Sequence, residues 1–139
     1  MPDRVAIFGP IAALAAAALA VLAWAYLLHD PNATVRRLTD TAVSVTGGDP
    51  AAGHDIILRS GCGACHRIPG VAAARGRVGP ALDDFASRAT IAGILPNSAE
   101  NLARFIEDPR AVDPQTAMPA LGLTRDEARD VAAFLYAPE

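Results

Sequence analysis

The longest apolar stretch of the chain runs from Val5 to Leu28, 24 residues without a charged side chain. A helix of this length measures about 36 Å, enough to cross a hydrocarbon core of about 30 Å. Trp24 and Tyr26 lie near its end, where aromatic rings favour the membrane–water interface. We therefore expect residues 1–28 to form a single N-terminal membrane anchor.

A cleaved signal peptide is the alternative, because Ala23-Trp24-Ala25 resembles a small-residue cleavage site. The apolar stretch is longer than the roughly 7–15 residues of a signal peptide, which favours the uncleaved anchor. In either case we expect the rest of the chain to be exported. The anchored form would be a single-pass protein of the cell inner membrane, with a cytoplasmic N-terminus and a periplasmic domain.

After the anchor the pattern changes. Residues 29–48 are polar, end in Gly47-Gly48 and lack a clear helical apolar stripe. They predict a flexible linker with a reach of about 25 Å. Residues 49–139 would form the folded domain. So short a domain with few apolar residues and long loops is marginal by itself, so we expect something else to fill its core.

Helical periodicity and capping signals predict three helices in this domain. They are expected at residues 50–60, 98–108 and 125–137, with Asp49, Asn97 and Thr124 as N-caps. Gly and Pro are frequent in residues 61–79 and 109–122, and no segment alternates as a strand does. The pattern therefore predicts an all-α domain with long irregular loops.

Composition narrows the function classes. The chain is 52% hydrophobic, but the excess lies in the apolar stretch, and the remainder is close to globular composition. A multi-span transporter, a disordered chain and a large multidomain enzyme are excluded. All 12 basic residues are Arg and the net charge is −3, so a nucleic-acid partner is not expected.

The two cysteines form the sequence Cys62-x-x-Cys65-His66, the attachment signature of c-type haem. Two intervening residues place the thiols at the separation of the two porphyrin vinyl groups, and His66 then lies below the iron. Gly61 and Gly63 would let the backbone approach the macrocycle. A zinc site lacks enough ligands, and a thioredoxin-type site lacks its βαβ setting. We expect one covalent haem c.

Met118, in a loop followed by Pro119, is the candidate sixth ligand, with core packing as the alternative. His54 is a further candidate, but it lies on the helix that leads into the motif. Met/His ligation saturates the iron and raises its reduction potential. This favours an electron carrier over an enzyme such as a peroxidase, or a gas sensor, and predicts no small-molecule substrate.

These residues together resemble the class I monohaem cytochrome c family over about residues 50–136. The resemblance rests on these features: Gly61 to His66, Gly79-Pro80-x-Leu82, Asp108-Pro109, Met118-Pro119, and a closing helix with Ala132, Leu135 and Tyr136. It implies a fold of about three to four helices around the haem. It also implies that the Pro80 carbonyl accepts a hydrogen bond from His66, that Leu82 packs on the haem, and that Arg88 binds a propionate. An exposed, unengaged Arg88 is the alternative.

Residues 91–97 resemble the cytochrome domains fused to subunit II of haem–copper oxidases and those of membrane-anchored cytochromes c. No copper-site domain precedes them, and the docking lysines of mitochondrial cytochrome c are absent. The expected function is single-electron transfer between membrane redox complexes: a quinol-oxidising complex or reaction centre, and a terminal oxidase. Membrane lipid would surround the anchor. A fixed haem subunit of a larger complex is the alternative, with Ala12, Ala16 and Ala20 as a helix-packing stripe.

Charge is uneven around the motif. Residues 59–82 contain four arginines (Arg59, Arg67, Arg75 and Arg77) and no acid. We expect a positive rim that steers the domain toward an acidic partner. The alternatives are that these arginines neutralise propionates or only solvate a loop.

Overall fold

The computed structural model describes residues 5–28 and 30–137, without the side chains of residues 5–10. It divides into two units, with the boundary between Thr34 and Val35. The parts of the expected anchor, linker and haem domain at residues 1–4, 29 and 138–139 lie outside the described residues.

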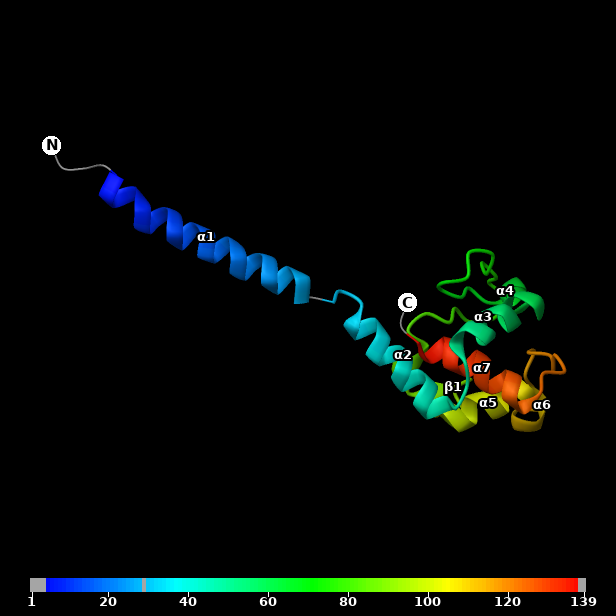
Figure 1. Ribbon diagram of the computed structural model, residues 1–139. Coiled ribbons are helices and arrows are strands. Elements are labelled where there is room, and N and C mark those ends of the chain that lie inside the picture. Colours follow the sequence, from blue (N-terminus) through cyan, green and yellow to red (C-terminus); the bar gives the residue numbers. More distant parts are fainter. Residues whose placement is uncertain (1–4, 29, 138–139) are drawn as a thin grey trace. The chain divides into compact units, whose positions relative to one another are not determined.

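The first unit consists mainly of helix α1 (Val5–Leu28), drawn in blue in Figure 1. Its bounds are those of the apolar stretch, and its side chains from residue 11 onward are all exposed. By length and composition it is suited to cross a membrane. The expected single long apolar helix is therefore confirmed, and its role as a membrane anchor stays a prediction.

Helix α2 (Ala33–Thr46) occupies most of the segment that we expected to be an irregular coil, and that expectation was wrong. Its threonine hydroxyls donate to carbonyls of the helix itself, for example Thr46 Oγ1 to Ala42 O at 2.7 Å. Because these bonds satisfy the hydroxyls locally, Thr46 can be buried beside Ala42. That this segment links an anchor to the domain stays a prediction.

The remaining helices and strands follow in the second unit. They are α3 (Pro50–Arg59), α4 (Cys62–Cys65), a 3₁₀ turn (Phe85–Ser87), β1 (Thr90–Ile91), β2 (Leu95–Pro96), α5 (Ala99–Glu107), α6 (Pro109–Val112) and α7 (Arg125–Tyr136). Helix α7 packs against both α3 and α5 (Figure 1). Strands β1 and β2 pair antiparallel, with Ile91 opposite Leu95. The domain is mostly helical as predicted, but the expectation of no strand was wrong at this two-residue ladder.

The helix caps test the sequence signals directly. Asp49 caps α3, with Oδ1 accepting from Ala51 N at 2.8 Å, and Thr124 forms the expected capping box with Glu127. The second predicted helix differs: Ser98, not Asn97, is the N-cap of α5, and the helix ends at Glu107. A serine hydroxyl caps as well as an asparagine amide, which leaves Asn97 free for another role.

The core lies where α3, α5 and α7 meet. Ile57, Leu102 and Ala132 are almost completely buried there. Gly53 allows the close packing of α3 on α7, because a Cβ at this position would collide with the backbone of Asp130. Cys62, Leu82 and Met118 are partly buried against the same cluster. The core thus extends directly to the predicted haem-binding residues.

Candidate haem site

Helix α4 is a single turn that carries both thiols. Gly61 precedes it in the left-handed region at φ 74°, a conformation that glycine adopts without strain. The backbone N–H of His66 donates to the Cys62 carbonyl at 3.0 Å and closes the turn. The imidazole therefore follows directly after the second thiol on a fixed backbone.

The His66 ring is held by the segment Gly79-Pro80. Its Nδ1 lies 2.7 Å from the Pro80 carbonyl oxygen, the contact that the family resemblance implies. Because a carbonyl only accepts hydrogen bonds, Nδ1 is the donor, and Nε2 keeps its lone pair for a metal. The Gly79 backbone also passes close to the ring, because a Cβ on Gly79 would lie 2.7 Å from Nδ1 and 2.9 Å from Nε2, and closer still to Cε1. Glycine is therefore required where the backbone passes the ring.

A loop after the motif wraps around α4. Gly76 N donates to the carbonyls of Gly63 and His66, at 3.0 and 3.2 Å. A side chain on Gly63 would lie 2.7 Å from the Cα of Ala74, so Gly63 is needed for packing against this loop. We had assigned Gly63 to close approach of the porphyrin. The structure gives it a different contact.

All seven residues predicted to bind the cofactor line one cavity of about 620 Å³. They are Cys62, Cys65, His66, Pro80, Leu82, Arg88 and Met118. Apolar side chains form most of the remaining wall, among them Ile57, Phe85 and Leu102. Two thiols, an imidazole and a thioether in one apolar cavity are the donor set that a covalent haem requires. The residues therefore fit a haem, and this cavity interrupts the core as expected.

Met118 reaches the cavity from the loop between α6 and α7. Its backbone N–H donates to Thr116 Oγ1 at 3.2 Å, which fixes the loop locally. Thr116 also lines the cavity and was not singled out from the sequence. His54 is not among the described residues that line the cavity, and its ring instead packs against Phe134, with centroids 5.6 Å apart.

Arg88 is half-buried, not an exposed surface side chain. Its Nη2 donates to the carbonyls of Ala81 and Asp83, at 2.5 and 2.9 Å. Its guanidinium carbon lies 5.1 Å from the centroid of the Phe85 ring. One guanidinium nitrogen of Arg88 therefore links two backbone carbonyls, and the residue itself lines the cavity. The propionate contact stays a prediction.

The thiol of Cys62 is partly buried. Burial raises its pKa above the ordinary value, a backbone hydrogen bond opposes the rise, and the neighbouring Cys65 adds to it. An apolar wall that disfavours thiolate charge is consistent with a cavity built for a porphyrin.

The expected positive rim is smaller than the sequence suggested. Arg59 forms an ion pair with Glu127 and Arg67 one with Asp83, each at 2.6 Å. Both acids lie outside residues 59–82, so the charge count of that segment alone missed them. Arg75 and Arg77 remain as the cations of this segment without such an ion pair among the described residues. Val78 next to them is highly exposed and lines the cavity.

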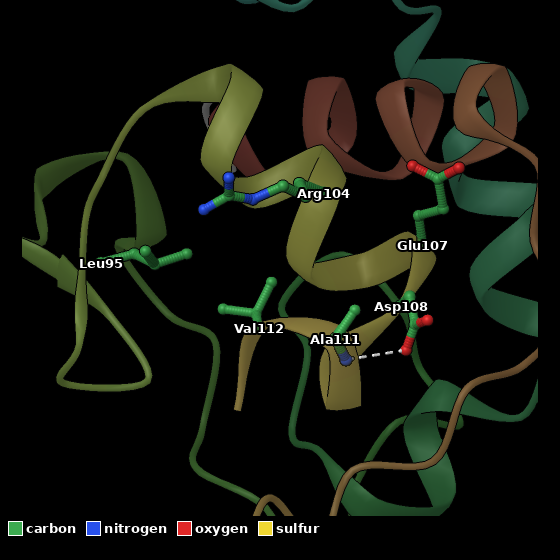
Figure 2. Close-up of a pocket in the computed structure, with 6 residues that line it drawn as sticks. All are labelled: Leu95, Arg104, Glu107, Asp108, Ala111 and Val112. Atoms are coloured by element: carbon green, nitrogen blue, oxygen red, sulfur yellow. Dashed lines mark hydrogen bonds between the residues drawn. The ribbon is translucent and has the colours of Figure 1, made fainter. Parts of the chain in front are cut away.

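A smaller cavity of about 370 Å³ lies beside the junction of α5 and α6 (Figure 2). Its lining residues are Leu95, Arg104, Glu107, Asp108, Ala111 and Val112. Asp108 Oδ1 accepts from Ala111 N at 3.1 Å and caps α6, the bond dashed in Figure 2. None of these residues is a thiol, imidazole or thioether, so the haem-type ligands gather in the larger cavity.

The fold and the larger cavity together define a c-type haem-binding domain. The family model described as "Cytochrome c" matches residues 50–137. The chain therefore belongs to the cytochrome c family, whose activity is haem-based electron transfer.

Two curated relatives are cytochrome c oxidase subunit 2 proteins. That of Alkalihalophilus pseudofirmus is 32% identical over 84 residues, which are 60% of this chain and 24% of the relative. That of Bacillus sp. strain PS3 is 32% identical over 89 residues, 63% of this chain and 25% of the relative. The chain thus spans about a quarter of the length of these relatives. No match was found among solved structures.

Proposed function

We propose that this chain is a membrane-anchored cytochrome that carries single electrons on one covalently bound haem c. The observation that supports this most strongly is the single cavity that collects both thiols, His66 and Met118 among apolar side chains. When bound, a haem with these ligands supplies a one-electron couple of raised potential with no open coordination position.

Each residue has a separate task in this assignment. Cys62 and Cys65 would hold the porphyrin by thioether bonds, and His66 and Met118 would bind the iron. The Pro80 carbonyl orients the imidazole by accepting a hydrogen bond from Nδ1, and Leu82 would pack against the porphyrin. Arg88 lies in the cavity wall, where its charge favours the reduced, less positive state of the site.

We place the haem domain in the periplasm, with α1 crossing the inner membrane and the N-terminus in the cytoplasm. The partners would be a quinol-oxidising complex or reaction centre as donor and a terminal oxidase as acceptor. Arg75, Arg77 and the exposed Val78 offer a contact face next to the thioether-forming cysteines. Intact mass of the haem protein tests the anchor, since a cleaved signal peptide removes about residues 1–25.

The alternative is a fixed haem subunit of a larger oxidase or quinol-oxidising complex. The relatives favour it, because both are named as oxidase subunits. Solubilisation in mild detergent separates the two functions: a carrier migrates alone, and a fixed subunit migrates with its complex.

The haem assignment is tested by changing both Cys62 and Cys65 to Ser. We expect covalently bound haem to be lost after denaturing electrophoresis, and retained covalent haem would overturn the assignment. Met118→Ala should abolish the methionine–iron charge-transfer band and let the ferric protein bind cyanide. His54→Ala is the matched control and should leave both properties unchanged. Cyanide binding by the unaltered protein would favour a peroxidase or gas sensor instead.

A further inference from the structure

Asn97 has a more specific role than the helix cap expected of it. Its side-chain Nδ2 donates to the carbonyls of both Phe85 and Arg88, each at 2.9 Å. Its backbone N–H donates to the Ala89 carbonyl at 3.0 Å. Asn97 therefore donates hydrogen bonds to the backbone carbonyls of three residues: Phe85, Arg88 and Ala89.

Tyr136, near the end of α7, completes this arrangement. Its hydroxyl donates to Asn97 Oδ1 at 2.8 Å, and its ring lies 6.4 Å from that of Phe85. The orientation of the Asn97 amide follows from these partners, because the two carbonyls accept and so must face the amide nitrogen. Burial raises the pKa of Tyr136, so its hydroxyl keeps the proton that it donates.

The arrangement leads to the haem cavity through Arg88. Asn97 and Tyr136 are not among the described residues that line the cavity, whereas Phe85 and Arg88 are. The Arg88 backbone is held by Asn97, and its guanidinium bonds back to the Ala81 and Asp83 carbonyls. Arg88 is thus held on both sides: its guanidinium bonds to residues 81 and 83, and its carbonyl accepts from Asn97.

We propose that Asn97 and Tyr136 are positioning residues that hold Arg88 in the cavity wall and thereby raise the reduction potential of the haem. The inference rests on the proposed function. Reduction removes one unit of positive charge from the site, so a half-buried cation fixed in a largely apolar wall stabilises the reduced form. A guanidinium released into solvent is screened and loses most of this effect.

The test is the midpoint potential of the holoprotein in a set of variants. Tyr136→Phe keeps the ring and removes one hydrogen bond, and Asn97→Ala removes the contacts to both carbonyls. We expect both variants to have lower potentials, with the larger shift in Asn97→Ala. Arg88→Gln should lower the potential as well, and adding Tyr136→Phe to it should cause no further shift. Such non-additivity is expected if both changes act through the Arg88 charge.

Asn101→Ala is the matched control. Asn101 also donates to a backbone carbonyl, that of Pro96 at 3.0 Å, and not to the carbonyls of Phe85, Arg88 or Ala89 that Asn97 holds. It should leave the potential unchanged. The inference is overturned if Tyr136→Phe loses thermal stability at unchanged potential, or shifts the potential equally with and without Arg88. If Asn97→Ala does not accumulate, the inference is decided by the effect of Tyr136→Phe in the wild type and its effect in Arg88→Gln. A wild-type protein without covalent haem would instead refute the proposed function.

Discussion

Gly79→Ala is the sharpest perturbation of the site, because the new methyl group would overlap the His66 ring. Its Cβ would lie 2.7 Å from Nδ1 and 2.9 Å from Nε2. Ordinary nonbonded contacts of such atoms are about 3.5 Å, so the ring or the backbone must move by about 1 Å. The 2.7 Å bond from Nδ1 to the Pro80 carbonyl would then stretch beyond hydrogen-bonding range.

The expected cost combines two effects. Overpacking of this kind destabilises by about 1–3 kcal/mol, and the lost hydrogen bond adds about 1 kcal/mol. For a domain of this size, about 1 kcal/mol corresponds to a Tm change of roughly 4–8 °C. We therefore expect the holoprotein to melt at least about 8 °C lower, with an altered haem-ligand spectrum because His66 has moved.

Thermal denaturation followed in the haem absorption bands measures both effects in one sample. Gly122→Ala is the control. Gly122 has φ 72° with nothing near its Cβ position, so alanine there strains the backbone by about 1 kcal/mol without touching His66. It should lower Tm but leave the ligand spectrum intact. If Gly79→Ala melts within about 4 °C of the wild type with an unchanged spectrum, the packing argument is wrong.

Three further predictions concern charge. Hydrogen bonds from the backbone and side chain of Thr124, and then Arg59, lower the pKa of Glu127. The stability that the Glu127 carboxylate adds is therefore complete above its unfolded-state pKa and is lost as pH falls through the lower folded-state pKa. When thermal stability is measured at decreasing pH, Glu127→Gln should lack this loss. Burial raises the pKa of Tyr136, so the stability that the neutral phenol adds is complete below its unfolded-state pKa and is lost as pH rises through the higher folded-state pKa. In alkaline denaturation, Tyr136→Phe should lack this loss of stability. Arg77→Gln should weaken the salt dependence of electron transfer to an acidic partner more than Arg67→Gln does, because Arg67 is already paired; equal effects in stopped-flow rates would contradict this.

The ion pairs also change how the domain surface is understood. Arg125 bonds to Glu100 and Glu107 and joins α7 to α5, whereas Arg59 joins the end of α3 to Glu127. These exposed or half-exposed pairs contribute little stability each. The Arg59–Glu127 pair, like the Arg67–Asp83 pair, reduces the net positive charge of residues 59–82. A docking face built from Arg75, Arg77 and Val78 is consequently less positive than the face that four unpaired arginines would form.

The sequence determined the features that depend on neighbours along the chain. The 24-residue apolar helix, the Asp49 and Thr124 caps and the Cys62-x-x-Cys65-His66 turn are all local, because spacing and capping fix them within a few residues. The seven predicted haem residues came from the motif, the single Met of the domain and the family resemblance. The cavity contains all of them.

Only the tertiary structure decided the contacts between distant segments. Asn97 looked like a helix cap because its role depends on Tyr136, 39 positions later in the chain. Gly79 is required by the His66 ring, and Arg67 is neutralised by Asp83 across a fold of the loop. Helix α2 was hidden because burial of Thr46 beside Ala42 depends on hydroxyl bonds within the helix. For Asn97, Gly79 and Arg67 the deciding interaction is short in space but joins residues far apart in the chain, so the folded chain alone could show it. The Thr46 hydroxyl bond is local, and there it is the burial of Thr46 that only the folded chain shows.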